Sequence, residues 1–271
     1  MTHYVSMDPA ALLLDLAARP VIGHRGAAAY APENTMASFH LALEQRADAL
    51  EFDVRMTRDH EAVVLHDRTL ERTTDAVGPI RLRTLKELEQ VDAGFRFSPD
   101  GRDYPWRGKG VRIPRLRQVI EDLPAVPLLI EVKEPEAQEA IARVLLETGA
   151  TARAVLAGSD WRSLQTFRAP PFHLGASRRD IARLYFRWGE PDPACRCFAV
   201  PDRFKFLPVP SRRFVDAAHA RGASVHVWTV DDPSLARRLW ANGANGMVTN
   251  RPDVMVVARG EFRVPSSESR G

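Results

Sequence analysis

Residues 20–67 read PVIGHRGAAAYAPENTMASFHLALEQRADALEFDVRMTRDHEAVVLHD. This stretch contains three short apolar runs, and a helical pattern separates the first run from the second. In a parallel barrel, side chains at the carboxyl ends of the strands meet on one face. We therefore expect one site to form from the polar residues that end these runs, which are His24 and Arg25, Glu51 and Asp53, and His66.

Apolar runs alternate with helical patterns along nearly the whole chain. Near-continuous apolar strands separated by helices indicate a parallel sheet covered on both faces. The predicted strands are 20–24, 49–54, 62–66, 127–133, 154–158, 173–177, 197–200, 224–230 and 246–250. The predicted helices are 35–45, 136–148, 161–167, 179–188, 212–220 and 234–241.

These strands are one too many for an eight-stranded barrel, and their spacing identifies the extra one. The link between 49–54 and 62–66 is too short for a parallel crossover, so 62–66 should return antiparallel. A hairpin tip at Asp59-His60 would place Asp53 opposite His66. The whole pattern predicts an α/β fold, a TIM (β/α)8 barrel with an extra β-hairpin after strand 2 and an inserted loop/helical segment before strand 3.

The chain has 271 residues, of which 45% are hydrophobic and 27% charged, as in an ordinary globular protein. We expect a single domain over 1–271, with the barrel at about 20–257. The Gly-, Pro- and Arg-rich insertion at about 68–115 is expected to form a lid or binding loop. The tail at about 264–271 is expected to be disordered.

Composition also excludes several classes of partner. The formal charge of +3 is spread along the chain without a basic and aromatic stripe, so nucleic acid is not expected. No apolar run is long enough for a transmembrane segment, although peripheral membrane contact stays open. The N-terminus lacks a basic region, and Asp15 interrupts its apolar stretch, so no signal peptide is expected. With Cys195 and Cys197 interpreted as reduced bystanders, a cytoplasmic location is expected.

Three carboxylates are predicted to converge on the barrel face, because LLIEVK adds Glu131 to Glu51 and Asp53. They would repel one another strongly without a cation between them. Ligands that are all oxygen atoms select a hard ion, so we predict one divalent cation, Mg²⁺ or Ca²⁺.

The remaining residues of the predicted site suit a phosphate ester. Imidazole titrates near neutrality, so of His24 and His66 one can accept a proton while the other donates one. Arg25 offers a planar fork that matches a phosphate edge, and Lys133 can neutralise charge on phosphoryl oxygens. Trp228 could pack against a substrate or belong to the core. Asn34 is interpreted as the cap of the following helix.

The motifs H-R-G, P-E-N-T, E-x-D, H-D, E-x-K, W-T-V and G-x-x-T-N-x-P follow one another over roughly 20–257. In this order they resemble the glycerophosphodiester phosphodiesterase family, and DAGFRFSP followed by RIPRL fits its insertion. The resemblance implies a TIM barrel of the PLC-like phosphodiesterase superfamily. It also implies hydrolysis of a small-molecule phosphodiester, a glycerophosphodiester, to sn-glycerol 3-phosphate and an alcohol.

Carried over residue by residue, the resemblance assigns a role to every position of the predicted site. It implies that the neighbouring glycerol hydroxyl attacks phosphorus, and that water then opens the resulting cyclic phosphate. The implied roles are catalysis for His24 and His66, metal binding for Glu51, Asp53 and Glu131, and phosphate contact for Arg25 and Lys133.

Two other functions remain to be distinguished from this one. A lysophospholipase D-like lipid phosphodiesterase would need an exposed apolar patch, which we expect around 95–112. A non-catalytic barrel that only binds a phosphate ligand would not need the two histidines, because binding alone requires no proton transfer.

Overall fold

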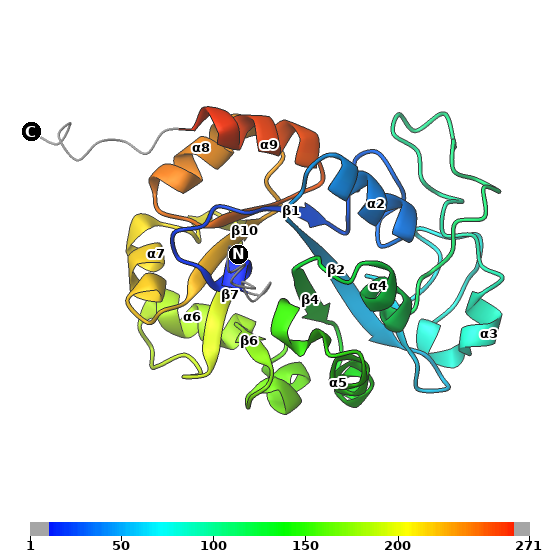
Figure 1. The fold of residues 1–271 in the computed structure, drawn as a ribbon, viewed down its shortest axis with the longest axis horizontal. Coiled ribbons are helices and arrows are strands. Elements are labelled where there is room, and N and C mark those ends of the chain that lie inside the picture. The colour runs from blue at the N-terminus through cyan, green and yellow to red at the C-terminus, as the bar shows by residue number, and fades with distance from the viewer. Residues whose placement is uncertain (1–10, 263–271) are drawn as a thin grey trace, which may run out of the picture.

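A computed structural model of the protein describes residues 11–262, and the tail expected at about 264–271 lies outside this range. A ring of strands surrounded by helices forms the body of this part of the chain (Figure 1). The ring closes because β1 pairs in parallel with both β2 and β11. The predicted TIM barrel is therefore confirmed.

The barrel strands lie close to the predicted ranges, because each is a nearly continuous apolar run. They are β1 (Val21–His24), β2 (Ala49–Met56), β4 (Leu128–Val132), β5 (Ala154–Ala157), β6 (His173–Gly175), β7 (Cys195–Pro201), β10 (Ser224–Trp228) and β11 (Gly246–Thr249).

Helices connect successive strands and cover the outside of the barrel (Figure 1). Residues 161–167 form a 3₁₀ helix, η4 (Trp161–Phe167), rather than an α-helix. The prediction missed α4 and α9, and α6 ends before Trp188 because Arg187 adopts a left-handed conformation. The α-helices of the barrel are α2 (Met36–Glu44), α4 (Leu116–Asp122), α5 (Gln138–Glu147), α6 (Arg178–Phe186), α7 (Arg212–His219), α8 (Pro233–Ala241) and α9 (Pro252–Glu261).

The extra strand β3 (Ala62–Val64) returns antiparallel along β2, as predicted, but its register differs by one residue. Val54 pairs with Val64, so the residue opposite Asp53 is Leu65 rather than His66. The reason is a turn with three central residues, in which the Thr57 amide donates to the Glu61 carbonyl.

The insertion, expected to form a lid or binding loop, forms a small body beside the β2–β3 hairpin (Figure 1). It contains the short helices η1 (Ile80–Leu82) and α3 (Leu85–Leu88). Its apolar side chains pack on one another and on Val63, so they stabilise the insertion itself. The cluster includes Leu70, Ile80, Leu88, Val111 and Ile113.

The amino-terminal end of the barrel is closed by the segment that begins with α1 (Ala11–Leu14). Leu13 is fully buried among side chains of the barrel interior, and its carbonyl accepts hydrogen bonds from Ser224 and His226. His226 is therefore structural. Throughout residues 11–262, no helix is both long and apolar enough to cross a bilayer.

Candidate active site

The H-R-G motif forms a tight turn at the carboxyl end of β1. Arg25 and Gly26 both have positive φ angles, of 52° and 89°. A Cβ atom on Gly26 would lie 2.3 Å from the Ser38 hydroxyl oxygen, so only glycine fits against α2 there. The turn also brings the Arg25 amide to within hydrogen-bond distance of the Glu51 carboxylate.

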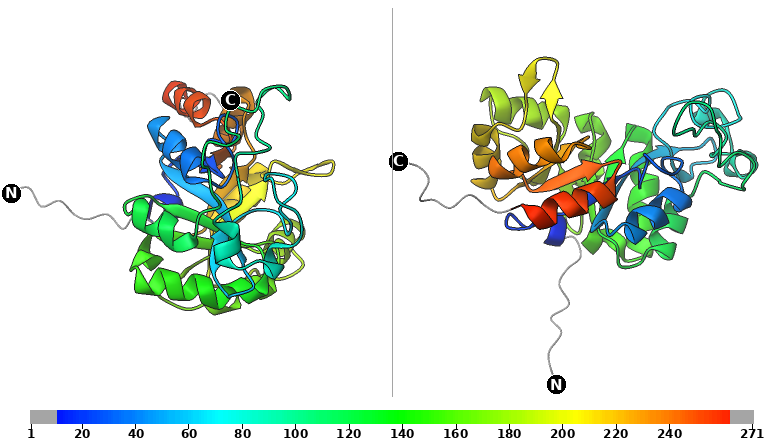
Figure 2. Two further views of the ribbon diagram at one scale, coloured as in Figure 1. Left: turned by 90° about the vertical axis from the view of Figure 1, so that its right-hand side faces the viewer. Right: turned by 90° about the horizontal axis from the view of Figure 1, so that it is seen from above.

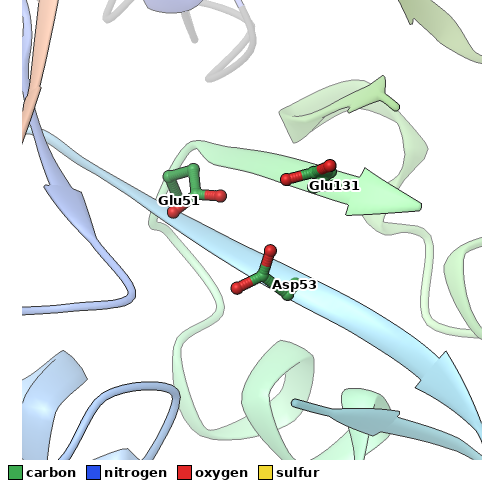
Figure 3. A group of neighbouring side chains, drawn as sticks. All are labelled: Glu51, Asp53 and Glu131. Atoms are coloured by element: carbon green, nitrogen blue, oxygen red, sulfur yellow. The ribbon is translucent and has the colours of Figure 1, made fainter. Parts of the chain in front are cut away.

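The three predicted carboxylates meet between β2 and β4, where Asp53 is in register with Glu131. Glu51 lies two residues before Asp53 on the same face of β2. One carboxylate oxygen from each residue lies within 4.8 Å of the other two. Figure 3 shows the three side chains pointing into one space.

The charges near these carboxylates differ, and so do their pKa values. Burial, followed by the nearby Asp53, raises the pKa of Glu51 well above its ordinary value and also raises the pKa of Glu131. Burial opposes ionisation of Asp53 as well, but Lys133 and Arg25 hold its pKa well below the ordinary range. The positive charges of the protein therefore offset the effect of burial at Asp53 but not at Glu51 and Glu131.

The cluster is suited to a divalent cation. Asp53 Oδ1 is buried without a hydrogen-bond partner, although Lys133 Nζ lies 3.1 Å away as an ionic contact. The carboxylate of Asp53 thus has an oxygen without a hydrogen-bond partner, and it lies next to the carboxylates of Glu51 and Glu131. Carboxylate oxygens are the ligands that hard cations prefer, so the donor set fits such an ion.

His24 is oriented by a chain of hydrogen bonds that also determines its tautomer. Asn250 donates from its side-chain nitrogen to the Asp231 carboxylate, which leaves the Asn250 oxygen to accept from His24 Nδ1 at 2.7 Å. The neutral ring therefore keeps its lone pair on Nε2, which lies 4.0 Å from Glu51 Oε2. Burial, followed by the charge of Arg25, lowers the pKa of His24 and favours this neutral form.

His66 is held in a similar way at the start of the insertion. Its Nδ1 lies 2.6 Å from Asp67 Oδ1, so Nε2 is the ring nitrogen left for a ligand. Arg72 pairs with both Asp67 and Glu33, and Glu33 in turn pairs with Arg25. A continuous set of ion pairs thus connects the surroundings of the two histidines.

Two cations lie beside the carboxylate cluster. Lys133, just beyond β4, lies 3.1 Å from both Asp53 and Glu131. Arg25 Nε lies 3.2 Å from Asp53 Oδ2, on the other side of that carboxylate group. Both residues line the cavity described below, so their positive charges are accessible to an anionic ligand.

A cavity of about 470 Å³ lies at the carboxyl ends of the strands. One wall carries the two histidines and the charged cluster, whereas apolar side chains of α6 and of the segment after β7 form the other wall. Trp228 also lines the cavity and is 41% exposed, so it is not a core residue. None of the described lining residues comes from 68–115.

Several residues of the site were missed in the sequence or given another role. Asn34 does not cap α2, since Thr35 does; instead Asn34 donates to Asp53 at 2.9 Å. Glu33, Asp67 and Asn250 stand in the motifs P-E-N-T, H-D and T-N-x-P, which was the available signal. Within the insertion, nothing in the sequence distinguished Arg72 from the other arginines.

Comparison with known proteins decides the family. The model of the glycerophosphoryl diester phosphodiesterase family matches residues 24–254. The chain belongs to this family. YhdW of Bacillus subtilis is 32% identical over 87% of this chain and 96% of its own. A glycerophosphodiester phosphodiesterase of Caldanaerobacter subterraneus is 30% identical, with the same coverage of each chain.

Solved structures of the glycerophosphoryl diester phosphodiesterase family share the fold. A phosphodiesterase from Oleispira antarctica, solved in complex with the product sn-glycerol-3-phosphate, matches with a TM-score of 0.73. It is 27% identical, and the match covers 90% of this chain and 98% of the other. The present protein is accordingly an enzyme, a phosphoric diester hydrolase.

Proposed function

We propose that the protein hydrolyses glycerophosphodiesters to sn-glycerol 3-phosphate and an alcohol by acid-base catalysis between His24 and His66. The observation that carries this proposal is the convergence of three carboxylates, with oxygens within 4.8 Å of one another, beside His24, whose Nε2 lies 4.0 Å from Glu51 Oε2. Membership in the family and the relative solved with sn-glycerol-3-phosphate support the substrate class. We further propose that the enzyme works as a single catalytic domain in a cytoplasmic location.

Glu51, Asp53 and Glu131 would hold one divalent cation, and their oxygen ligands suit Mg²⁺ or Ca²⁺. When bound, this cation neutralises charge on the phosphate and polarises its oxygens. Arg25 and Lys133 both line the cavity and orient the phosphate.

The two histidines divide the proton transfers between them. One Nε2 accepts the proton of the neighbouring glycerol hydroxyl as its oxygen bonds to phosphorus, and the other histidine protonates the leaving alcohol. The roles then exchange while water opens the cyclic phosphate. Asn250 and Asp67 keep both rings in the tautomer that this exchange requires.

Turnover of glycerophosphocholine, with Mg²⁺, with Ca²⁺ or after chelation, tests the proposal. We expect activity only with a divalent cation, and a loss of roughly 10²- to 10⁴-fold in kcat for His24→Ala. Activity that survives both chelation and His24→Ala would refute the assigned mechanism.

A further inference from the structure

Exposed aromatic side chains gather at the mouth of the cavity, on α6 and the hairpin that follows β7. The hairpin pairs β8 (Arg203–Phe204) with β9 (Leu207–Pro208), and Figure 2 shows it standing away from the barrel. Phe206, in the turn, is 93% exposed, and Phe204 is 60% exposed. Such exposure is costly in water unless the side chains meet a partner.

The end of α6 contributes the other half of this rim. Trp188 is 77% exposed and stacks on Phe186, with ring centroids 4.5 Å apart. Phe186 and Tyr185 also line the cavity, together with Phe204 and Leu207. The rim is thus continuous with the apolar wall inside the cavity.

Charge identifies the kind of partner. The rim segments read FRW at 186–188 and RFKFL at 203–207, and they carry the basic residues Arg187, Arg203 and Lys205. Two acidic residues border them: Asp202, 3.9 Å from Arg203, and Glu190, which pairs with Arg221. All three basic residues are exposed. Aromatic residues interleaved with basic ones are typical of surfaces that enter the interface of an anionic lipid layer.

We expected the exposed apolar patch that a lipid substrate needs around 95–112, but the structure has such a patch elsewhere. In that segment Trp106 is half-buried against the core of the insertion, and Tyr104 packs against Arg107. The exposed aromatic cluster lies instead beside the cavity, where a lipid substrate would have to enter.

We propose that the rim docks on an anionic lipid surface and that the apolar wall receives the acyl chain of a lysophospholipid. This inference rests on the proposed function, because the phosphodiester of the lipid would occupy the same charged cluster. The chain would extend from that cluster along Ile181 and Tyr185 toward the hairpin. Phe206 and Trp188 do not line the cavity, so their role would be in docking alone.

The chemistry restricts the substrate to a lipid with a single chain. The free hydroxyl beside the phosphate-bearing carbon bonds to phosphorus and loses its proton to one histidine. The bond from phosphorus to the headgroup oxygen breaks, and that oxygen takes a proton from the other histidine. Water then adds to phosphorus and restores the hydroxyl. A diacyl phospholipid lacks the free hydroxyl and should not react.

Vesicle binding tests the docking surface. We compare vesicles of phosphatidylcholine alone with vesicles that also contain phosphatidylglycerol, by co-sedimentation of the whole protein. Binding should be at least about tenfold tighter to the anionic vesicles. The double variant Phe206→Ser/Trp188→Ser should lose this binding, whereas the control Leu146→Ser/Val257→Ser, on outer helices, should keep it.

Docking on lipid is overturned if the rim variant binds anionic vesicles as the wild type does. It is also overturned if the rim mediates self-association of the protein instead. That result would appear as dimers that Phe206→Ser/Trp188→Ser dissociates, without vesicle binding by the wild type.

Turnover tests the acyl-chain site. A lysophosphatidylcholine with a short chain, soluble as a monomer, should have a kcat/KM roughly tenfold or more above that of glycerophosphocholine. The rim variant should keep wild-type turnover of glycerophosphocholine and lose roughly tenfold or more on lysophosphatidylcholine in anionic vesicles.

The two substrates distinguish failure of this inference from failure of the proposed function. Turnover of glycerophosphocholine that equals or exceeds turnover of the short-chain lysophospholipid would overturn the acyl-chain site and leave the proposed function standing. Turnover of neither substrate would overturn the proposed function, and this inference with it.

Discussion

At the residue scale, charge rather than burial distinguishes the three clustered carboxylates. Glu51 and Asp53 are both buried, yet their pKa values move in opposite directions. Asp53 has Lys133 on one side and Arg25 on the other, whereas Glu51 has Asp53 as a near neighbour of like charge. A cation beside Glu51 would supply the missing charge.

Replacing Glu51 by Gln removes one ligand charge with little change of shape. We expect Mg²⁺ affinity to fall and kcat to drop by orders of magnitude, while the circular dichroism spectrum stays unchanged. Calorimetric titration of the metal and glycerophosphocholine turnover measure the two effects. Glu44→Gln, an exposed carboxylate at the end of α2, is the control. Wild-type affinity and turnover in Glu51→Gln would exclude Glu51 as a ligand.

His66→Ala should separate catalysis from binding. Because the imidazole transfers a proton and does not hold the phosphate, we expect kcat to fall by roughly 10²- to 10⁴-fold. Binding of sn-glycerol 3-phosphate, measured by titration, should stay within a few fold of the wild type. Undiminished turnover would remove His66 from the catalytic pair.

Asn250 is a positioning residue, because it acts through His24. Asn250→Ala frees the ring to rotate and to change tautomer, so kcat should fall by roughly 10- to 100-fold, less than loss of the imidazole costs. KM and metal affinity should change little, because Asn250 does not line the cavity. Equal losses in kcat and in metal affinity would indicate a structural role instead.

At the scale of elements, the junction of β1 and α2 depends on Gly26. Gly26→Ala forces alanine into a left-handed conformation and a clash with Ser38, so the free energy of unfolding should fall by roughly 3 kcal/mol or more. Gly78→Ala is a matched control, because Gly78 has a similar φ of 93° with open space around it. The free energy of unfolding of Gly78→Ala should fall by only about 1–2 kcal/mol.

Urea unfolding at neutral pH measures both glycine variants. Equal losses in the two would mean that α2 moves away from the turn, so that only the backbone conformation contributes to the cost.

At the scale of the whole molecule, His226 makes stability depend on pH by joining β10 to the N-terminal segment. Burial lowers its pKa to about 4 from 6.5. As pH falls below 6.5 the unfolded chain takes up a proton that the folded chain does not, so stability decreases until about pH 4. This shift corresponds to a loss on the order of 3 kcal/mol.

His226→Gln should remove that part of the pH dependence, even if it is less stable at neutral pH. Urea unfolding from pH 7 to pH 4 measures how the free energy of unfolding changes with pH in the wild type and in His226→Gln. His40→Gln is the control, because His40 is an exposed histidine on α2. Parallel curves for wild type and His226→Gln would mean that His226 is not the source of the pH dependence.

The sequence by itself determined the barrel and the inner residues of the site. Apolar periodicity located the strands, and strand ends necessarily meet on one face of a barrel, so Glu51, Asp53 and Glu131 could be brought together without coordinates. The hairpin was predictable to within one residue, because its register depends on a turn that the link length alone does not specify.

Only the tertiary structure decided which surface the loops cover. Trp106 of the insertion and the aromatic residues at 186–188 and 203–207 read alike in sequence, yet Trp106 packs against the core of the insertion and the others face solvent beside the cavity. The sequence also did not predict the hydrogen-bond and ion-pair partners of Asn34, Arg72 and Asn250. Such contacts join segments far apart in the chain, and local pattern carries no information about long-range packing geometry.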